Sequence, residues 1–505
     1  MPQSYLKRIL DARIYDLAVE TPLDKARQMS QRLNNTVLLK REDLQPVFSF
    51  KIRGAYNKML QLSAEQRRVG VIAASAGNHA QGLALAANHL NVVATIVMPK
   101  TTPQIKVDGV RRNKGKVVLH GDTYDEAYAY SQKLVEEKGL VYIHPFDDPD
   151  VIAGQGTVAA EILRQYPAHI DAIFIPVGGG GLCAGMAAYI KYIRPDIKVI
   201  AVEAEDSACL KLAMEKKRRA ILSEVGIFAD GVAVKQIGKE TFRVLKNTID
   251  EVITADTDQM CAAIKDIFED TRSIAEPAGA LALAGLKKYV EREGCEGKTL
   301  IAIDSGANTN FDRLRYISER TETGEKREAV LAVTLPERPG AYKKFCKDLG
   351  KRNITEFNYR YADSRAAQVF VGIQVSGDTD DRTHLVQSLR DKKYAVEDLT
   401  DNEMAKLHIR HMVGGRTGSS IEDEVVYRFE FPERPGALLK FLSSLAHSWN
   451  ISMFHYRNHG SAYGRVLVGL QVPTNERALI RKYLDDLGYN YWEETNNPAY
   501  QLFLS

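Results

Sequence analysis

The sequence lacks the long apolar runs, the strong charge of one sign and the clustered cysteines that mark several large classes of protein. No apolar run reaches the roughly 18 residues that a membrane span requires, and the first residues do not contain the apolar core of a signal peptide. A formal net charge of +3 on 505 residues leaves no basic face for a nucleic acid. We therefore expect a cytoplasmic protein with no membrane partner and no nucleic-acid partner.

Cysteine is scarce, and its positions do not form the usual disulfide or metal patterns. The five cysteines are widely spaced, odd in number and never arranged as Cys-x-x-Cys, so we expect buried thiols in a reducing compartment. His408 and His411 have the i, i+3 spacing of a helical metal pair, but they have no neighbouring carboxylate or cysteine. We expect a solvated helix face there and no metal site.

A chain of this length needs more than one hydrophobic core, and its pattern changes along its length. Between residues 36 and 316, short apolar runs such as "VIAAS" and "AIFIPV" alternate with helix-like segments. Runs that are apolar at every position are typical of parallel strands covered on both faces. We therefore expect an α/β domain over residues 1–317, followed by an exposed, charged linker over residues 318–328.

The last third of the chain contains an internal repeat. The phrase "PERPGA" occurs at residues 336–341 and 432–437, and each copy continues to a similar strand, "VFVGIQV" or "VLVGLQV". Within a copy, the order is strand, Pro-Gly turn, helix, two strands, helix and strand, which is a βαββαβ unit. We expect two small α+β domains over residues 329–401 and 424–495, joined by a connector over residues 402–423.

The first candidate catalytic residue is Lys51 in "FSFKIRGAYNKML". It stands between Phe50 and Ile52 at the expected start of a helix, where apolar neighbours and the helix N-terminus both disfavour an ammonium group. A lowered pKa would leave a free amine that can attack a carbonyl group. Taken alone, however, the pattern favours an exposed lysine in a first helical turn.

A second candidate is the loop Ser75-Ala76-Gly77-Asn78, which lies between an expected strand and a helix rich in small residues. Backbone N–H groups and the Asn78 amide at a helix N-terminus can bind an anion such as a substrate carboxylate. The same residues also suit an ordinary helix start with Asn78 as the capping group.

A third candidate is the run of four glycines from Gly178 to Gly181, between a buried strand and a helix. Each glycine costs roughly 0.5–1 kcal/mol relative to alanine unless the backbone must approach another group closely, and a phosphate is such a group. No Gly-Lys-Ser/Thr follows, so the run is not a nucleotide P-loop. It also fits the dinucleotide pattern G-x-G-x-x-A, with Glu203 about 20 residues further on, so a nicotinamide cofactor is an alternative.

The stretch "TLIAIDSGANTNF" ends another expected strand in a polar turn. The Ser305 hydroxyl could hydrogen-bond a ring nitrogen and leave it unprotonated, whereas Asp304 could protonate it; a serine that only stabilises the turn is the simpler explanation of this residue alone. Together, the four candidates predict a cofactor with an aldehyde, a phosphate and a heterocyclic nitrogen. Pyridoxal 5′-phosphate has these three groups.

The motifs "SFKIRGA", "SAGNHAQG", "VGGGGL" and "SGAN", in this order and spacing, resemble those of the fold-type-II pyridoxal-phosphate enzymes, specifically the biosynthetic threonine dehydratases (threonine ammonia-lyases). The resemblance covers essentially the whole chain, because "DNEMAKLHIRHMVGGR" and "ETNNPAYQLFL" look like that family's regulatory half. It implies a catalytic domain of two α/β subdomains with twisted, mostly parallel sheets, and two ACT-like regulatory domains.

The resemblance also implies a role for each motif. Lys51 would hold pyridoxal phosphate as a Schiff base and take the substrate's α-proton, and Asn78 would contact the cofactor's 3-hydroxyl. The loop from Ser75 to Asn78 would hold the substrate carboxylate, and Ser305 would face the pyridine nitrogen. The cofactor phosphate would be held by Gly178, Gly179, Gly180, Gly181 and Leu182. Relatives that racemise serine carry a second serine at the position of Ala76, which argues against racemisation.

By the same resemblance, the chain would convert L-threonine to 2-oxobutanoate and ammonia in the committed step of isoleucine biosynthesis, with L-serine as the alternative substrate. It would be a homotetramer. Isoleucine would inhibit its activity, and valine would relieve that inhibition. The effector sites would be bordered by Pro339, Gly340, Ala341 and Asn353 in the first copy and by Pro435, Gly436, Ala437 and Asn450 in the second. The sequence leaves open whether both copies bind an effector.

Three other interpretations remain at this point. A catabolic serine/threonine dehydratase or a threonine synthase would share the motifs, although the catabolic enzymes lack two regulatory domains. A nicotinamide-dependent oxidoreductase would use the glycine fingerprint at Gly179. A non-catalytic amino-acid sensor would use the α/β domain only to bind its ligand.

Overall fold

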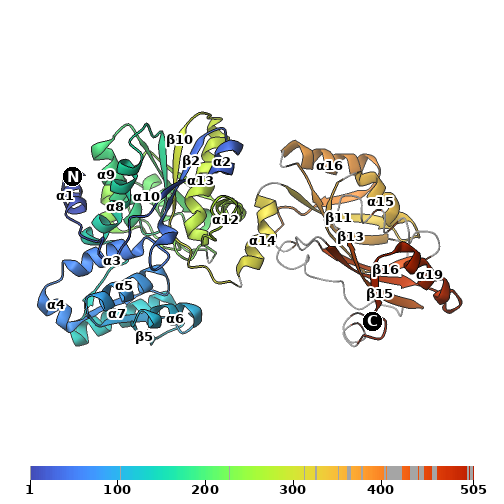
Figure 1. The fold of residues 1–505 in the computed structure, drawn as a ribbon, viewed down its shortest axis with the longest axis horizontal. Helices are drawn as coiled ribbons and strands as arrows, with labels where there is room; N and C mark the ends of the chain where they lie inside the picture. The colour runs from blue at the N-terminus through green and yellow to red at the C-terminus, as the bar shows by residue number, and fades with distance from the viewer. Residues whose placement is uncertain are drawn as a thin grey trace. The chain divides into compact units, whose positions relative to one another are not determined.

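The computed structural model of the chain folds as two units, Met1–Gly324 and Glu325–Ser505 (Figure 1). The structure describes all residues except 1, 103, 227, 312, 325–326, 351, 361–365, 377–378, 403–404, 406–422, 433–438, 440–441, 443–448, 458–462, 498–499, 501–503 and 505. Among the described residues, no helix has the length and apolar composition that a membrane crossing requires. All five cysteines are free, and four of them are buried.

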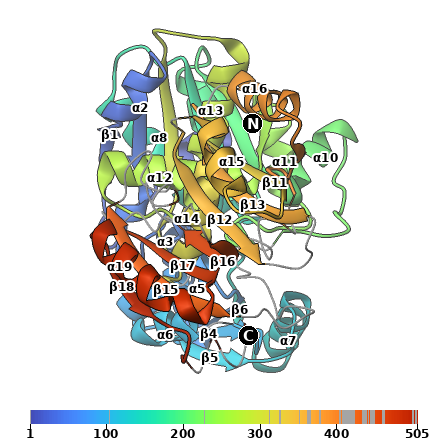
Figure 2. The ribbon, with the colours of Figure 1, turned by 90° about the vertical axis from the view of Figure 1, so that its right-hand side faces the viewer.

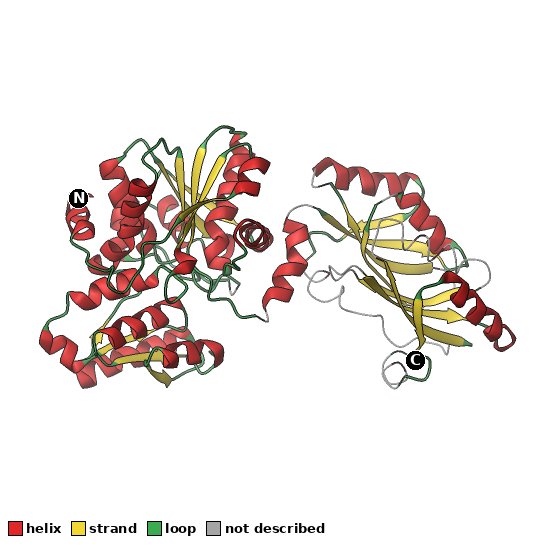
Figure 3. Ribbon diagram, in the orientation of Figure 1, coloured by secondary structure: helices red, strands yellow, loops and turns green. Residues whose placement is uncertain are grey.

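The larger sheet of the first unit has six strands in the order β1-β2-β10-β7-β8-β9, all parallel except the edge strand β1 (Figure 3). Its strands are β1 (Leu23–Lys25), β2 (Thr36–Arg41), β7 (Ala172–Pro176), β8 (Lys198–Ala204), β9 (Glu251–Ala255) and β10 (Thr299–Asp304). Along β7, Ile173 and Ile175 pack into one apolar cluster and Phe174 into another. Because successive side chains of a strand point to opposite faces, the sheet is covered on both sides, as the apolar runs predict.

The smaller sheet of the first unit has four parallel strands in the order β5-β4-β3-β6. These strands are β3 (Val71–Ala74), β4 (Ala94–Met98), β5 (Lys116–Leu119) and β6 (Val141–Tyr142). Ile72 and Val97 face one apolar cluster, while Val71 and Ile96 face another. The predicted α/β architecture with two subdomains is therefore confirmed.

Helices cover both sheets of the first unit (Figure 1). They are α1 (Pro2–Leu10), α2 (Arg27–Arg32), η1 (Glu42–Leu44), α3 (Lys51–Leu60), α4 (Ala64–Val69), α5 (Asn78–His89), α6 (Gln104–Arg112), α7 (Tyr124–Lys138), α8 (Pro149–Gln165), α9 (Gly181–Ile193), η2 (Glu205–Ser207), α10 (Cys209–Glu215), α11 (Lys239–Leu245), α12 (Thr257–Thr271), α13 (Pro277–Glu293) and α14 (Arg313–Gly324). Helices α3, α5 and α9 begin at or beside the sequence motifs and therefore position the site.

The stretch expected to begin an exposed linker is helical. Residues 318–324 form the second half of α14, and Thr321 is buried, with its Oγ1 donating to Ile317 O (2.8 Å) and Cys261 O (3.3 Å). Arg320 is also buried and lies 3.2 Å from Asp258 of α12. The charge of this stretch therefore belongs to a helix that packs on α12, and composition alone did not distinguish this from a loop.

The second unit is built on one eight-stranded sheet in the order β14-β11-β13-β12-β16-β17-β15-β18. Its elements are β11 (Glu328–Pro336), α15 (Ala341–Leu349), β12 (Ile354–Arg360), β13 (Ala366–Gln374), α16 (Thr379–Asp391), β14 (Ala395–Asp398), β15 (Glu424–Pro432), β16 (Asn450–Arg457), β17 (Tyr463–Gln471), η4 (Thr474–Glu476), α19 (Arg477–Leu487) and β18 (Asn490–Glu493). The first copy has the predicted βαββαβ order. In the second copy, the segment between β15 and β16 lies mostly outside the described residues.

The two copies share a sheet and a core. Strand β12 of the first copy pairs antiparallel with β16 of the second, from Glu356 opposite Arg457 to Arg360 opposite Met453. Helices α15, α16 and α19 lie on the same face of the sheet (Figures 1 and 2). One apolar cluster contains residues of both copies, Phe357 and Phe454 among them. The repeat therefore forms a single folded body rather than two separate modules.

A network of buried charges fixes helix α3 within the first unit. Arg53 of α3 binds Glu42 (Nε–Oε2, 2.7 Å) and Glu161 of α8 (Nη1–Oε1, 2.5 Å), and Lys40 of β2 also binds Glu161 (Nζ–Oε2, 2.6 Å). All four side chains are fully buried. Because each charge needs its partner in a medium of low polarity, the network holds the start of α3, and so Lys51, against α8 and the large sheet.

Arg53→Met should lower the free energy of unfolding by about 3–5 kcal/mol, because it leaves the carboxylate of Glu42 buried without its cation. Chemical denaturation measures the change. Arg315→Met, at an arginine whose side chain is 73% exposed, is the control and should have little effect. An equal loss of stability in both variants would contradict a structural role for the network.

Candidate active site

Lys51 is the first residue of α3, and its amine lies in a largely apolar environment. Its Nζ donates to Pro145 O (3.1 Å) and lies 5.3 Å from the centre of the Phe50 ring. Burial lowers the pKa of Lys51 to about 8, and the Glu276 carboxylate opposes that shift. A substantial fraction of the amine is therefore neutral near physiological pH and can act as a nucleophile or a base.

The loop from Ser75 to Asn78 connects β3 to α5 and faces residues of the large subdomain. Asn78 Nδ2 donates to Glu276 Oε1 (2.6 Å), and Asn78 Oδ1 accepts from Asn308 Nδ2 (2.8 Å). Ser75 Oγ accepts from Gly77 N (3.3 Å). The amide of Asn78 is therefore held in one orientation at the N-terminus of α5, where an anion is favoured.

His79 follows this loop and is buried. Its Nε2 lies 2.9 Å from Ile143 O, to which it donates, and burial together with the charge of Lys51 lowers the pKa of His79 to about 3. The imidazole is therefore neutral, and it links α5 to the segment that follows β6.

The four glycines lie between β7 and α9, and protein atoms surround them closely. Gly180 has φ +89°, a conformation that favours glycine, and precedes α9 as a cap with no side chain. A Cβ at Gly179 would lie 2.2 Å from the Phe146 ring, and one at Gly178 would lie 2.8 Å from Val232 Cα. Leu182 is buried in the first turn. The N-terminus of α9 thus offers backbone N–H groups without a capping side chain, which suits a phosphate.

Ser305 follows β10 and is buried, and its Oγ donates to Ala278 O (3.2 Å). Asp304, the other candidate partner for a ring nitrogen, lies 3.7 Å from Arg41 Nε. Burial and the neighbouring Asp43 raise the pKa of Asp304 well above its usual range. Because adjacent strand residues point to opposite faces, Asp304 belongs to the Arg41 side of the sheet and not to the Ser305 side.

Backbone contacts bring these motifs together. Phe50 N, next to Lys51, donates to Ser305 O (3.3 Å), and Ser49 pairs with Gly306. A Cβ at Gly82 of α5 would lie 3.1 Å from Ile52 N, so the asparagine helix packs directly on the lysine helix. The structure therefore places the lysine, the asparagine loop, the glycine run and the serine turn around one region of the first unit.

Several residues of this region had no strong sequence signal. Glu276, the residue before α13, is buried, and burial together with the Asp230 carboxylate raises its pKa to about 7. Asn308 also donates to Val47 O (2.8 Å), and Phe146 covers Gly179. Asp-Pro at residues 148–149 is a helix-start signal, but nothing local indicates that the residues before it reach the glycine run.

The dinucleotide interpretation required a free carboxylate at Glu203. Glu203 is buried and accepts from Leu210 N (2.7 Å) and Lys211 N (2.8 Å) at the start of α10. Both oxygens are thus used within the protein, and the residue is not available to bind a ribose.

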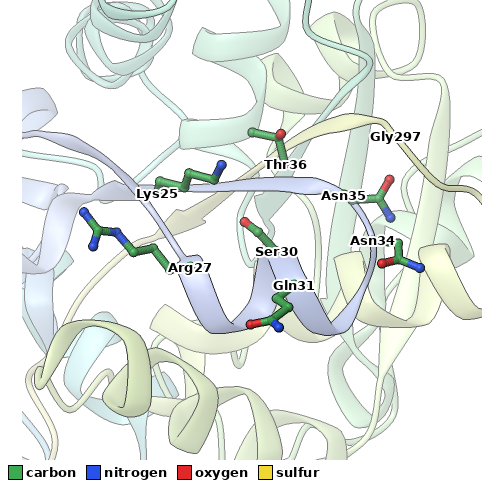
Figure 4. Close-up of a pocket in the computed structure, with 8 residues that line it drawn as sticks. All are labelled: Lys25, Arg27, Ser30, Gln31, Asn34, Asn35, Thr36 and Gly297. Atoms are coloured by element: carbon green, nitrogen blue, oxygen red, sulfur yellow. The ribbon is translucent and has the colours of Figure 1, made fainter.

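A cavity of about 540 Å³ lies beside α2 and the start of β2 (Figure 4). It is lined by Lys25, Arg27, Ser30, Gln31, Asn34, Asn35, Thr36 and Gly297. None of these residues belongs to the motifs, and the side chain of Asn35 is bonded to Leu33 O (2.6 Å) and Cys295 O (2.9 Å).

In the second unit, a pocket of only about 20 Å³ lies between the two copies, so an amino acid could enter it only if the lining side chains moved apart. Pro339 and Gly340 line it from the first copy, and Asn450 lines it from the second. The remaining lining residues are Arg338, Tyr342, Lys343, Leu442, Trp449 and Ile451. Ala341 and Asn353 are not among the residues that line it. Pro435, Gly436, Ala437, His408 and His411 lie outside the described residues.

Two family models match the chain. The model described as "Pyridoxal-phosphate dependent enzyme" matches residues 14–306, and the model described as "C-terminal regulatory domain of Threonine dehydratase" matches residues 319–409 and 415–504. The first contains the lysine, asparagine, glycine and serine motifs, and the second contains both copies of the repeat.

Individual relatives match over the full length. "L-threonine dehydratase biosynthetic IlvA" of Burkholderia multivorans is 57% identical over 506 residues, covering 99% of each chain. The protein of the same name from Escherichia coli (strain K12) is 54% identical, covering 99% of this chain and 97% of its own. Among solved structures, the processed form of threonine deaminase isoform 2 from Solanum lycopersicum aligns with a TM-score of 0.62 and 50% identity, covering 63% of this chain and 93% of that one.

The environment of Lys51 predicts the pH at which its amine becomes reactive. Without cofactor, acetylation of Lys51 should rise through a midpoint near pH 8, because burial lowers the pKa of the amine. Glu276→Gln should move the midpoint lower, since it removes the carboxylate that favours the charged form. Peptide mass spectrometry after brief labelling measures both midpoints, and a midpoint equal to that of a free lysine peptide would contradict the prediction.

Proposed function

The chain belongs to the biosynthetic threonine dehydratases, a family of pyridoxal-phosphate-dependent lyases, and on this premise we propose that it catalyses the committed step of isoleucine biosynthesis under effector control. Threonine deamination is the activity of this family. The observation that supports its assignment to the first unit is the meeting of Lys51, Asn78, the glycine run and Ser305 in one region.

Pyridoxal phosphate, when bound, supplies an aldehyde that combines with amines and a conjugated ring that withdraws electrons from the α-carbon. Lys51 would carry the cofactor covalently between turnovers and, once free, would accept the α-proton of threonine at Nζ. A pKa near 8 suits both tasks, because the amine is partly neutral at working pH. Pro145 O keeps the amine in place by accepting its hydrogen bond.

The remaining motifs bind and orient. The first N–H groups of α9 and the backbone of Gly178 to Gly181 would hold the phosphate. The loop from Ser75 to Asn78 would hold the substrate carboxylate at the N-terminus of α5. Ser305 would turn its hydroxyl from Ala278 O to donate to the ring nitrogen. It would leave that nitrogen unprotonated, because a hydroxyl is a far weaker acid than a carboxyl group. A neutral ring would withdraw electrons less strongly, which would favour loss of the β-hydroxyl over racemisation. The hydroxyl would take up a proton and leave as water, and hydrolysis of the enamine that remains would give 2-oxobutanoate and ammonia.

The pocket between the two copies is our candidate for the effector site. Arg338, Lys343 and the start of α15 place positive charge and N–H groups where an amino-acid carboxylate would bind. Asn450 Nδ2 donates to Glu337 Oε1 (3.1 Å) and Gln471 Oε1 (3.0 Å), so a carboxylate lies beside this lining residue, where an ammonium group would be favoured.

The apolar lining of the pocket suits a branched side chain. Leu442, Trp449 and Ile451 supply it, all three buried. Isoleucine and valine differ by one methylene group, whose burial contributes about 0.8 kcal/mol. Valine would therefore compete for the same site but would stabilise the inhibited state less than isoleucine does. From the family resemblance we also propose a cytoplasmic homotetramer, with L-serine as a poorer substrate.

Lys51→Ala should lower kcat for release of 2-oxobutanoate and ammonia from threonine by at least about a thousandfold, because the variant loses both the cofactor attachment and the base. Lys133→Ala, at an exposed lysine of α7, is the control and should retain full activity. Near-normal turnover by purified Lys51→Ala would show the assignment to be wrong.

The chain has only two tryptophans, which makes effector binding visible. Isoleucine should change the fluorescence of Trp449, which lines the pocket, but not that of Trp492, which lies beneath the Arg428 guanidinium. Trp492→Phe should therefore keep the isoleucine-dependent signal and Trp449→Phe should lose it. A signal that survives in Trp449→Phe would place the effector elsewhere.

A further inference from the structure

The segment from His144 to Asp148, between β6 and α8, contacts several parts of the candidate site. Pro145 O accepts from Lys51 Nζ (3.1 Å), and the Phe146 ring covers Gly179. His144 Nδ1 accepts from Phe146 N (3.2 Å) and Asp147 N (2.8 Å), which fixes the turn. One side chain of this segment, Asp147, has no role in the chemistry described above.

Asp147 caps a helix that lies 92 residues further along the chain. Its Oδ2 accepts from Lys239 N (2.8 Å), and its Oδ1 accepts from Glu240 N (2.7 Å) and Thr241 N (3.2 Å). These are the first N–H groups of α11, whose own cap residue, Gly238, has no side chain. A Cβ at Gly238 would lie 2.4 Å from Asp147 Oδ1, so the glycine is what lets the carboxylate approach. A charged acceptor for three N–H groups is a strong cap.

Helix α11 in turn holds the glycine run. Thr241 Oγ1 donates to Gly179 O (2.8 Å), and Gly238 N also donates to Gly179 O (3.4 Å). The side chains of Ile237 and Leu245 pack against Gly180. In a planar trans peptide, the N–H of one residue points away from the C=O of the residue before it. Holding Gly179 O therefore fixes the direction of the Gly180 N–H, on the opposite side of that peptide.

We propose that Asp147 is a positioning residue for the phosphate end of the cofactor. It holds the N-terminus of α11, α11 holds Gly179 O through Thr241, and the N–H groups at the start of α9 are thereby aimed at the phosphate. This inference rests on the proposed assignment of Gly178 to Gly181 to the phosphate. It predicts that a change at Asp147 weakens recognition of the phosphate and leaves recognition of the aldehyde intact.

The test compares two probes on protein freed of cofactor: pyridoxal phosphate, and pyridoxal, which has the aldehyde and the ring but no phosphate. Absorbance titration gives the Kd of each. Asp147→Asn keeps the size of the side chain but removes its charge and one acceptor, and it should raise the Kd of pyridoxal phosphate about tenfold. The Kd of pyridoxal should not change.

Two further variants separate positioning from loss of stability. Thr241→Val removes only the hydroxyl that binds Gly179 O, so it should also raise the Kd of pyridoxal phosphate. The double variant Asp147→Asn/Thr241→Val should have a Kd for pyridoxal phosphate no higher than that of the weaker-binding single variant. Asp256→Asn weakens the cap of α12, where Asp256 Oδ1 accepts from Gln259 N (2.8 Å), far along the chain from the glycine run. It should lower thermal stability and leave both Kd values unchanged.

Equal changes for the two probes in Asp147→Asn, or a change no larger than in Asp256→Asn, would overturn the proposal. Additive effects of Asp147→Asn and Thr241→Val would also overturn it, because they would place the two residues on separate routes. If the unaltered protein bound pyridoxal as tightly as pyridoxal phosphate, the assignment of the glycine run would fail, and the role of Asp147 would fail with it.

Discussion

The first unit depends on holding the amine of Lys51 in a partly buried, largely apolar place while leaving it within reach of a carbonyl compound. An ammonium group in that place is unfavourable, and burial lowers its pKa to about 8. The amine needs a polar partner, which is Pro145 O, and a rigid base, which the buried Arg53 network gives to α3. The reactive property of this lysine therefore comes from the packing of several distant elements as well as from its sequence neighbour Phe50.

Close backbone approach is the second condition for the site. Gly82 lets α5 pack on the start of α3, and Gly179 lets Phe146 cover the glycine run. Neighbouring parallel strands end at a common edge, so the loops after β7 and β10 of the large sheet lie together. The loop after β3 leaves the small sheet and reaches the large subdomain through the bonds of Asn78 to Glu276 and Asn308. Glycine in this region thus serves packing between protein elements, such as Phe146 on Gly179, as well as approach to a phosphate.

The sequence predicted the parts of the site that local pattern encodes: strand ends, helix starts, the glycine run and the repeated strands. It did not predict contacts between segments far apart in the chain. Asn78 binds Glu276, 198 positions away, and Asp147 caps a helix 92 positions away, and neither partner carries a pattern that names the other. The charged stretch over residues 318–324 was wrongly expected to be a linker, because composition does not reveal that Thr321 is buried on α12.

The second unit joins its two copies in one sheet, and the pocket at their junction takes residues from both, so a ligand there would bind to the pair and not to one copy. The effector control that we propose would act on catalysis only if the chemistry of the first unit takes place at Lys51. Borohydride reduction of the protein with bound pyridoxal phosphate, followed by peptide mass spectrometry, tests this most directly. We predict a pyridoxyl group on Lys51. A pyridoxyl group on another lysine, with Lys51 unmodified, would contradict the assignment of the site.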